Sequence, residues 1–110
     1  MIRSSERLRT ILDGLPGSGP ALSMLEERLL RSLRTQGERA VRGRLVTRHA
    51  FEARQRPGGV ALVMEIEGRH AMSVAQQLAK RFSLVEDVGN AEVTRTERGA
   101  QLALRAKDVA

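Results

Sequence analysis

Residues 41–54 place arginines at even positions and mostly apolar side chains at odd positions. This alternation predicts a β-strand with one buried and one solvated face, because successive side chains point to opposite faces of a sheet. We call the solvated set the arginine stripe; it consists of Arg42, Arg44, Arg48 and Arg54. A row of guanidinium groups on one face can follow the phosphates of a nucleic acid or pair with carboxylates.

The next segment supplies carboxylates to the arginine stripe. Residues 60–67 also alternate, and those that share the solvated face are Ala61, Val63, Glu65 and Glu67. Residues 57–59 (Pro-Gly-Gly) predict the turn of a hairpin. Inward residues must pair with inward ones, so we expect Phe51 opposite Met64, which sets Arg48 opposite Glu67. Opposed charges across strands are mildly stabilising, and the pattern therefore favours a solvated, charge-paired sheet face.

Small apolar side chains share this face with the arginines; they are Val46, Ala50, Ala61, Val63 and Ala103. Such a mixture is typical of a surface on which another protein packs, and edge strands also recruit partners. We therefore predict a partner-binding sheet face made of Arg42, Arg44, Arg48, Arg54, Val63, Glu65 and Glu67. Nucleic-acid binding is the alternative. RNA-recognition sheets carry exposed aromatics, whereas the aromatic residues of this chain, apart from its histidines, are Phe51 and Phe82.

Other reactive residue types are scarce or scattered. The chain contains no cysteine, which excludes disulfides, thiolate catalysis and cysteine zinc sites. His49 falls on the apolar side of a strand and predicts a hydrogen-bonded core or interface histidine, and His70 lies near a helix start. Glycines precede a helix at residues 14–19, but no Gly-Lys-Ser/Thr follows them. No carboxylate pair is arranged for acid–base work. We therefore expect no enzyme activity, cofactor, metal or small-molecule substrate.

The charge of the chain is concentrated rather than spread. Its 110 residues carry a net charge of +6, and the excess lies mainly between residues 37 and 59. The longest apolar run, residues 60–64, is far shorter than the roughly 20 residues of a membrane span. It is also shorter than the roughly 7-residue apolar region of a signal peptide. The length allows one domain with a tail.

Hydrophobic periodicity predicts the elements that position these residues. Residues 5–12 predict a short helix, and residues 16–20 a linker rich in Gly and Pro. A leucine-striped helix follows from about residue 20 to residue 36, starting after Ser18 and ending at Gly37. Further segments are a strand (41–54), a strand (60–67), a helix (70–82), an irregular strand (84–96) and a strand (100–107).

This order contains two helix-strand-strand halves. Two such halves predict a ferredoxin-like α+β fold, αββαββ, with a four-stranded antiparallel sheet and two helices on one face. The domains are then an N-terminal helix or stalk remnant (1–15), a linker (16–20) and the ferredoxin-like domain (21–107).

Residues 21–107 resemble the small ferredoxin-like domains of the L and M components of bacterial type II secretion. The same order occurs in the related type IV pilus alignment proteins. The likeness rests on a leucine-striped helix (ALSMLEERLLRSL), a strand with alternating small residues (VRGRLVTRHAFEAR), a Gly-led strand (GGVALVMEIEG), a helix (MSVAQQLAKRF) and a terminal hairpin (NAEVTRTERGAQLALRA). The resemblance implies homodimerisation, pairing with sister components and no catalysis. It also implies a membrane-anchored parent whose domain lies in the periplasm; without such a parent we expect a cytoplasmic protein.

We therefore expect a non-enzymatic interaction and dimerisation module of a bacterial envelope assembly. The alternative is a small basic nucleic-acid-binding domain that uses the arginine stripe. A small-molecule regulatory domain is a third class, for which the sequence offers no pocket.

Overall fold

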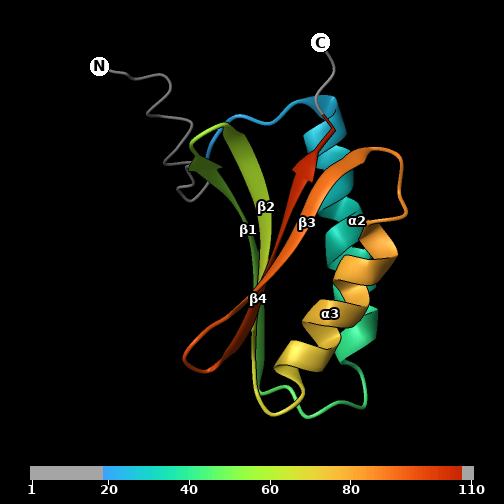
Figure 1. Cartoon of the computed structure of the whole chain (residues 1–110), viewed down its shortest axis with the longest axis vertical. Coiled ribbons are helices and arrows are strands. Elements are labelled where there is room, and N and C mark those ends of the chain that lie inside the picture. Colours follow the sequence, from blue (N-terminus) through green and yellow to red (C-terminus); the bar gives the residue numbers. More distant parts are fainter. Residues whose placement is uncertain (1–18, 108–110) are drawn as a thin grey trace, which may run out of the picture.

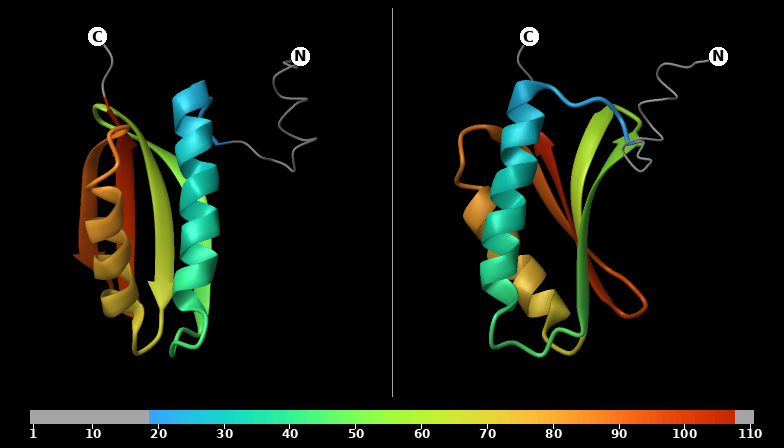
Figure 2. Two further views of the ribbon diagram at one scale, coloured as in Figure 1. Left: turned by 90° about the vertical axis from the view of Figure 1, so that its right-hand side faces the viewer. Right: turned by 180° about the vertical axis from the view of Figure 1, so that it is seen from behind.

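A computed structural model describes residues 19–107, which form two helices and one sheet (Figure 1). The elements in chain order are α2 (Met24–Val41), β1 (Arg48–Arg56), β2 (Gly59–Glu67), α3 (Ala71–Phe82), β3 (Val88–Arg95) and β4 (Gly99–Ala106). The four strands lie in the order β1-β2-β4-β3, and every neighbouring pair is antiparallel. Both helices cover one face of the sheet (Figure 2). This is the predicted ferredoxin-like α+β fold. The predicted helix over residues 5–12 and most of the linker lie outside the described residues.

The core lies between the helices and the covered sheet face. Its largest fully buried side chains from the sheet include Leu62, Met64 and Leu102, and α3 contributes Leu78 and Phe82. Each buried side chain of this size stabilises the fold by about 1.5–3 kcal/mol. The apolar face predicted for α3 is confirmed, because the inward positions of that helix are all buried. The layer of helices thus leaves the other sheet face open.

The first helix begins and ends later than predicted. Ser23, not Ser18, caps it: the Ser23 hydroxyl accepts from the Glu26 N–H at 3.1 Å while the Glu26 carboxylate accepts from the Ser23 N–H at 2.9 Å. The prediction that Gly37 ends the helix is wrong, because Gly37 is buried inside it. A Cβ at Gly37 would stand 2.8 Å from the ring of Phe51 and 2.9 Å from the sulfur of Met64. Glycine is needed there for close packing of α2 on the sheet.

The first strand also begins later than predicted. It starts at Arg48 rather than at residue 41, because α2 continues to Val41 and residues 42–47 form a connection. Gly43 has a left-handed φ of 70° within that connection. The third strand likewise starts at Val88 rather than at residue 84. The predicted hairpin register is confirmed: Phe51 lies opposite Met64.

Candidate interaction surface

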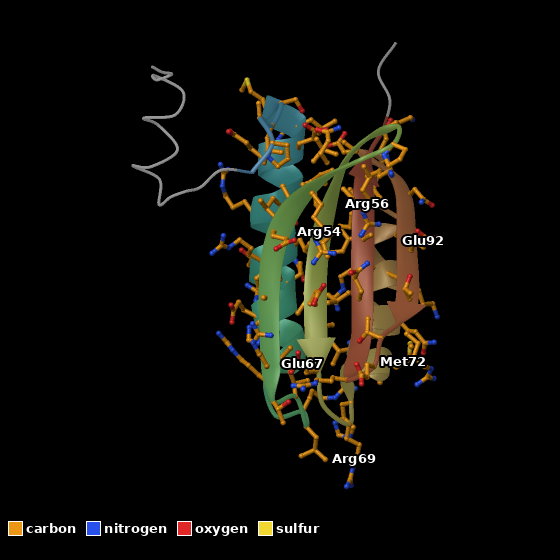
Figure 3. All side chains as sticks on the ribbon, turned by 90° about the vertical axis from the view of Figure 1, so that its left-hand side faces the viewer. Arg54, Arg56, Glu67, Arg69, Met72 and Glu92 are labelled. Carbon is orange, nitrogen blue, oxygen red and sulfur yellow. The ribbon has the colours of Figure 1, made fainter. Side chains whose placement is uncertain are left out.

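The open sheet face carries a grid of charged side chains at the outward positions of all four strands. Figure 3 looks onto this face, where Arg54, Glu67 and Glu92 are labelled. Arg48 lies opposite Glu67, as the sequence predicted, and their side chains form an ion pair of 3.3 Å. Arg48 remains 67% exposed and Glu67 24%. Arg48 therefore keeps donor groups free for a further partner.

Arg54 is the centre of the grid. Its guanidinium donates to the carboxylates of Glu52 and Glu65, the latter at 2.6 Å, and to the amide oxygen of Gln101 at 3.0 Å. The hydrogen bond to Glu52, followed by that to Glu65, raises the already high pKa of Arg54. The side chain thus joins β1, β2 and β4 and stays charged at every physiological pH.

Three small side chains of the open face are buried beneath this grid. Ala61, Val63 and Ala103 are 1%, 0% and 7% exposed and form a second apolar cluster, separate from the main core. Val63 was predicted to be part of the partner-binding face, but a residue with no exposed area touches no partner in this conformation. Because Arg54 lies opposite Ala61 and bonds across to Glu65, its side chain crosses the sheet above this cluster.

The outward charges of the four strands balance. The basic residues at these positions are Arg48, Arg54, Arg56 and Arg105, and the acidic ones are Glu52, Glu65, Glu67 and Glu92. The alternation of β3 and β4 was available in the sequence, but the predicted site did not include Gln101, Arg105 and Glu92. A balanced face attracts a polyanion far less than the predicted stripe of arginines would.

The structure divides the arginine stripe. The placement of Arg42 and Arg44 on the strand is wrong, because α2 extends to Val41 and both residues lie in the connection before β1. Arg44 instead donates to the Ser73 hydroxyl at 2.7 Å and to the Gln77 amide oxygen at 3.2 Å, which anchors the connection to α3. Only Arg48 and Arg54 of the stripe remain on the sheet face.

Both histidines have structural partners. The Nε2 atom of His49 lies 3.2 Å from the Glu38 carboxylate of α2, and its ring packs edge-on against Phe51 with 5.7 Å between centroids. The Nδ1 atom of His70 accepts from the Leu45 N–H at 2.9 Å, while the His70 N–H donates to the Leu45 carbonyl at 3.0 Å. Among residues 19–107 no group of three or more His, Asp or Glu side chains is arranged to hold a metal.

A cleft of about 560 Å³ opens where α2 begins and the β1–β2 hairpin turns. Some of its polar groups are engaged: Ser23 and Glu26 bind each other, and Arg105 donates to the Pro57 carbonyl at 3.2 Å. Asn90 and Lys107 also line the cleft.

The two edges of the sheet differ. In an antiparallel ladder hydrogen-bonded pairs alternate with non-hydrogen-bonded pairs, and the pair beside the turn, Arg56 and Gly59, is hydrogen-bonded. The even-numbered residues of β1 therefore bond to β2, and the backbone groups of His49 and Phe51 point away from it. β1 runs for nine residues with one continuous register. β3 instead has a register shift between Val88 and Asn90, and such irregularities protect an edge from pairing. β1 is therefore the edge better suited to receive another strand.

No family model, curated protein or solved structure matches this chain. Neither described helix is long and apolar enough to cross a membrane.

Proposed function

We propose that this chain is a non-enzymatic interaction module that pairs with another protein chain through the β1 edge of its sheet. The observation that carries the proposal is the contrast between this edge and the rest of the sheet. The helices cover one face, internal ion pairs occupy the other, and a register shift interrupts β3, whereas the outer backbone groups of β1 pair with no other strand among residues 19–107. Such an edge is a template for β-strand addition.

The type of assembly is proposed from the sequence resemblance. A ferredoxin-like module of the type II secretion kind would dimerise and pair with sister components in the periplasm, held there by a membrane-anchored parent. A fusion of the full gene to a reporter that is active only outside the cytoplasm tests this part. Reporter activity is expected, and a signal confined to the cytoplasm would contradict the location without affecting the edge-pairing proposal.

Sedimentation velocity tests pairing itself. Across protein concentrations from about 1 µM to 1 mM, which span the affinities of weak to moderate complexes, we expect a concentration-dependent shift from monomer to dimer. A strict monomer over the whole range would contradict homodimerisation.

The second candidate function is nucleic-acid binding, for which the exposed arginines of α2 offer a basic surface. Four arginines of α2 are exposed and form no ion pair with another described residue; we call them the helix arginines, and they are Arg28, Arg31, Arg34 and Arg39. A labelled oligonucleotide at about 150 mM salt tests this candidate. Binding that weakens steeply with salt and is lost on Arg28→Gln with Arg31→Gln would support it. The matched control is Arg95→Gln, on the far edge strand.

A further inference from the structure

Few registers allow β1 to pair with β1 of a second copy. Only odd-numbered residues point their backbone groups to the edge, so odd residues must face odd ones. A register centred on Phe51 sets Arg48 opposite Arg54 of the second copy. One centred on Glu52 sets Glu52 opposite Glu52 of the second copy. Centring on Ala50 sets Arg48 opposite Glu52 of the second copy, twice by symmetry. This register alone of the three places opposite charges across the new strand pair.

The remaining registers are weaker. A register centred on His49 places Ala50 opposite Arg48 and forms no ion pair. One centred on Ala53 sets Glu52 opposite Arg54 of the second copy but is obstructed, since Gly19 lies beside the edge-facing Ala53 carbonyl: a Cβ built on Gly19 would be 3.7 Å from that oxygen. Figure 2 shows the segment before α2 passing this end of β1. Among residues 19–107, the stretch of the edge that no other segment approaches is therefore centred near Ala50.

The helix side of the sheet independently favours the same register. Centring on Ala50 places His49 opposite Phe51 of the second copy. Within one chain Glu38 lies 3.2 Å from His49, and Arg34 lies over Phe51 with 5.9 Å to the ring centroid. Arg34 of one copy then faces Glu38 of the other, so a second pair of opposite charges forms on the helix layer. In this one register, opposite charges would face each other both on the open sheet face and on the helix layer.

The helices have room in this arrangement. Gly37 packs against both Phe51 of β1 and Met64 of β2, so α2 lies over the seam between these strands. In a continuous sheet, the two symmetry-related seams are two strand spacings apart, about 10 Å. Packed helices lie about 8–10 Å apart. The two α2 helices would therefore pack side by side without a clash.

We infer that two copies of this chain pair antiparallel through β1, with Ala50 facing Ala50 across the two-fold axis, to form one eight-stranded sheet. The small Ala50 side chains let the backbones approach at the centre, and Arg48–Glu52 pairs flank them. This inference rests on the proposed function, and it specifies the partner and the register.

Disulfide trapping tests the register cleanly because the chain has no cysteine of its own. Ala50 is exposed and, in this register, its Cα lies about 4.5 Å from Ala50 of the second copy, within disulfide range. Ala50→Cys in the full chain should form a covalent dimer under mild oxidation at least about tenfold faster than Glu52→Cys, because paired strands raise the effective concentration of the thiols. Arg48→Cys mixed with Glu52→Cys should yield mainly the mixed dimer.

The outcomes separate the register from the proposed function. If the unmodified chain sediments as a dimer but Ala50→Cys forms a disulfide no faster than Glu52→Cys, the register is overturned and the interaction module stands. A strict monomer overturns both. If amide exchange finds His49 and Phe51 protected in a monomer, a segment of the same chain outside residues 19–107 occupies the edge, and the inference is also overturned.

Discussion

The Arg54 network predicts a large loss of stability from one surface substitution. Arg54→Met removes the guanidinium and keeps an unbranched side chain over the buried cluster. Exposed ion pairs contribute about 0.2–1 kcal/mol each, and better shielded charged hydrogen bonds about 1.5–3. Arg54 and Glu65 are 34% and 39% exposed, so we place each of the two ion pairs near the lower range and add about 0.5 kcal/mol for Gln101. The expected loss is about 1–2 kcal/mol.

Arg54→Ala tests the contribution of the Arg54 methylene groups to stability separately from that of its guanidinium. It also removes the methylene groups over Val63, which is fully buried now and would become partly exposed. Full burial of a valine is worth about 1.5–3 kcal/mol, so partial exposure adds about 1 kcal/mol and brings the total to about 2–3. The matched control is Arg48→Met, whose single ion pair is 67% exposed on the arginine side; we expect at most about 0.5 kcal/mol.

Urea unfolding followed by far-ultraviolet circular dichroism measures these differences, because the chain has no Trp or Tyr for fluorescence. All variants are compared at one protein concentration, since pairing would add to apparent stability. If Arg54→Met and Arg48→Met agree within about 0.5 kcal/mol, the network does not stabilise the fold. If Arg54→Ala equals Arg54→Met, the covering role of Arg54 is wrong.

The same variants give a pH prediction. The folded-state pKa of Arg54 is raised by its carboxylate partners, so its contribution is complete below the unfolded pKa and is lost only as pH rises through the folded value. Both values lie far above neutrality. The difference between Arg54→Met and the unmodified chain should therefore stay constant between about pH 6 and pH 9.

Two further predictions concern the backbone. Gly99→Ala should destabilise the fold by about 2–4 kcal/mol in urea unfolding, because a Cβ there would stand 2.1 Å from the Ile66 carbonyl oxygen. The control Gly43→Ala meets no atom within 4 Å and has only an unfavourable φ, so it should cost about 1 kcal/mol. His70→Ala should cost about 0.5–1.5 kcal/mol by removing the acceptor of the exposed Leu45 N–H, and His70→Asn, which keeps an acceptor near the same place, should recover at least half. Equal losses for the two variants would contradict the role of Nδ1.

Sequence periodicity correctly predicted the half-buried strands and helices. It did not predict features that depend on tertiary contacts. The outward and inward faces of β1 and β2 followed from alternation, and the turn at Pro57-Gly58 fixed their register. Alternation also ran back across residues 41–47, where no strand forms, because arginine and apolar residues alternate there by composition alone. Gly37 has the residue type of a helix end, but its role is contact with Phe51, which no local pattern encodes.

The candidate site was likewise predicted from the sequence only in part. Period-two spacing correctly assigned Val63 to the outward side, but its burial depends on the length and direction of the Arg54 side chain above it. The sequence could predict that charges of both signs share this face, whereas the way one guanidinium joins three strands required the packed sheet.

The energetics of desolvation distinguish the β1 edge from the open face as a place for a partner. Arg54, Glu52 and Glu65 already satisfy one another while partly exposed to water. A partner laid over them would remove that water and offer few new bonds, and burying paired charges costs several kcal/mol unless each regains a partner. The backbone groups of His49 and Phe51 are different, because a second strand replaces their water with equivalent hydrogen bonds and brings Arg48 a second carboxylate at the rim. In the proposed dimer, the charges of this chain would therefore set the register at the β1 edge, whereas on the open face their mutual pairing would oppose a partner.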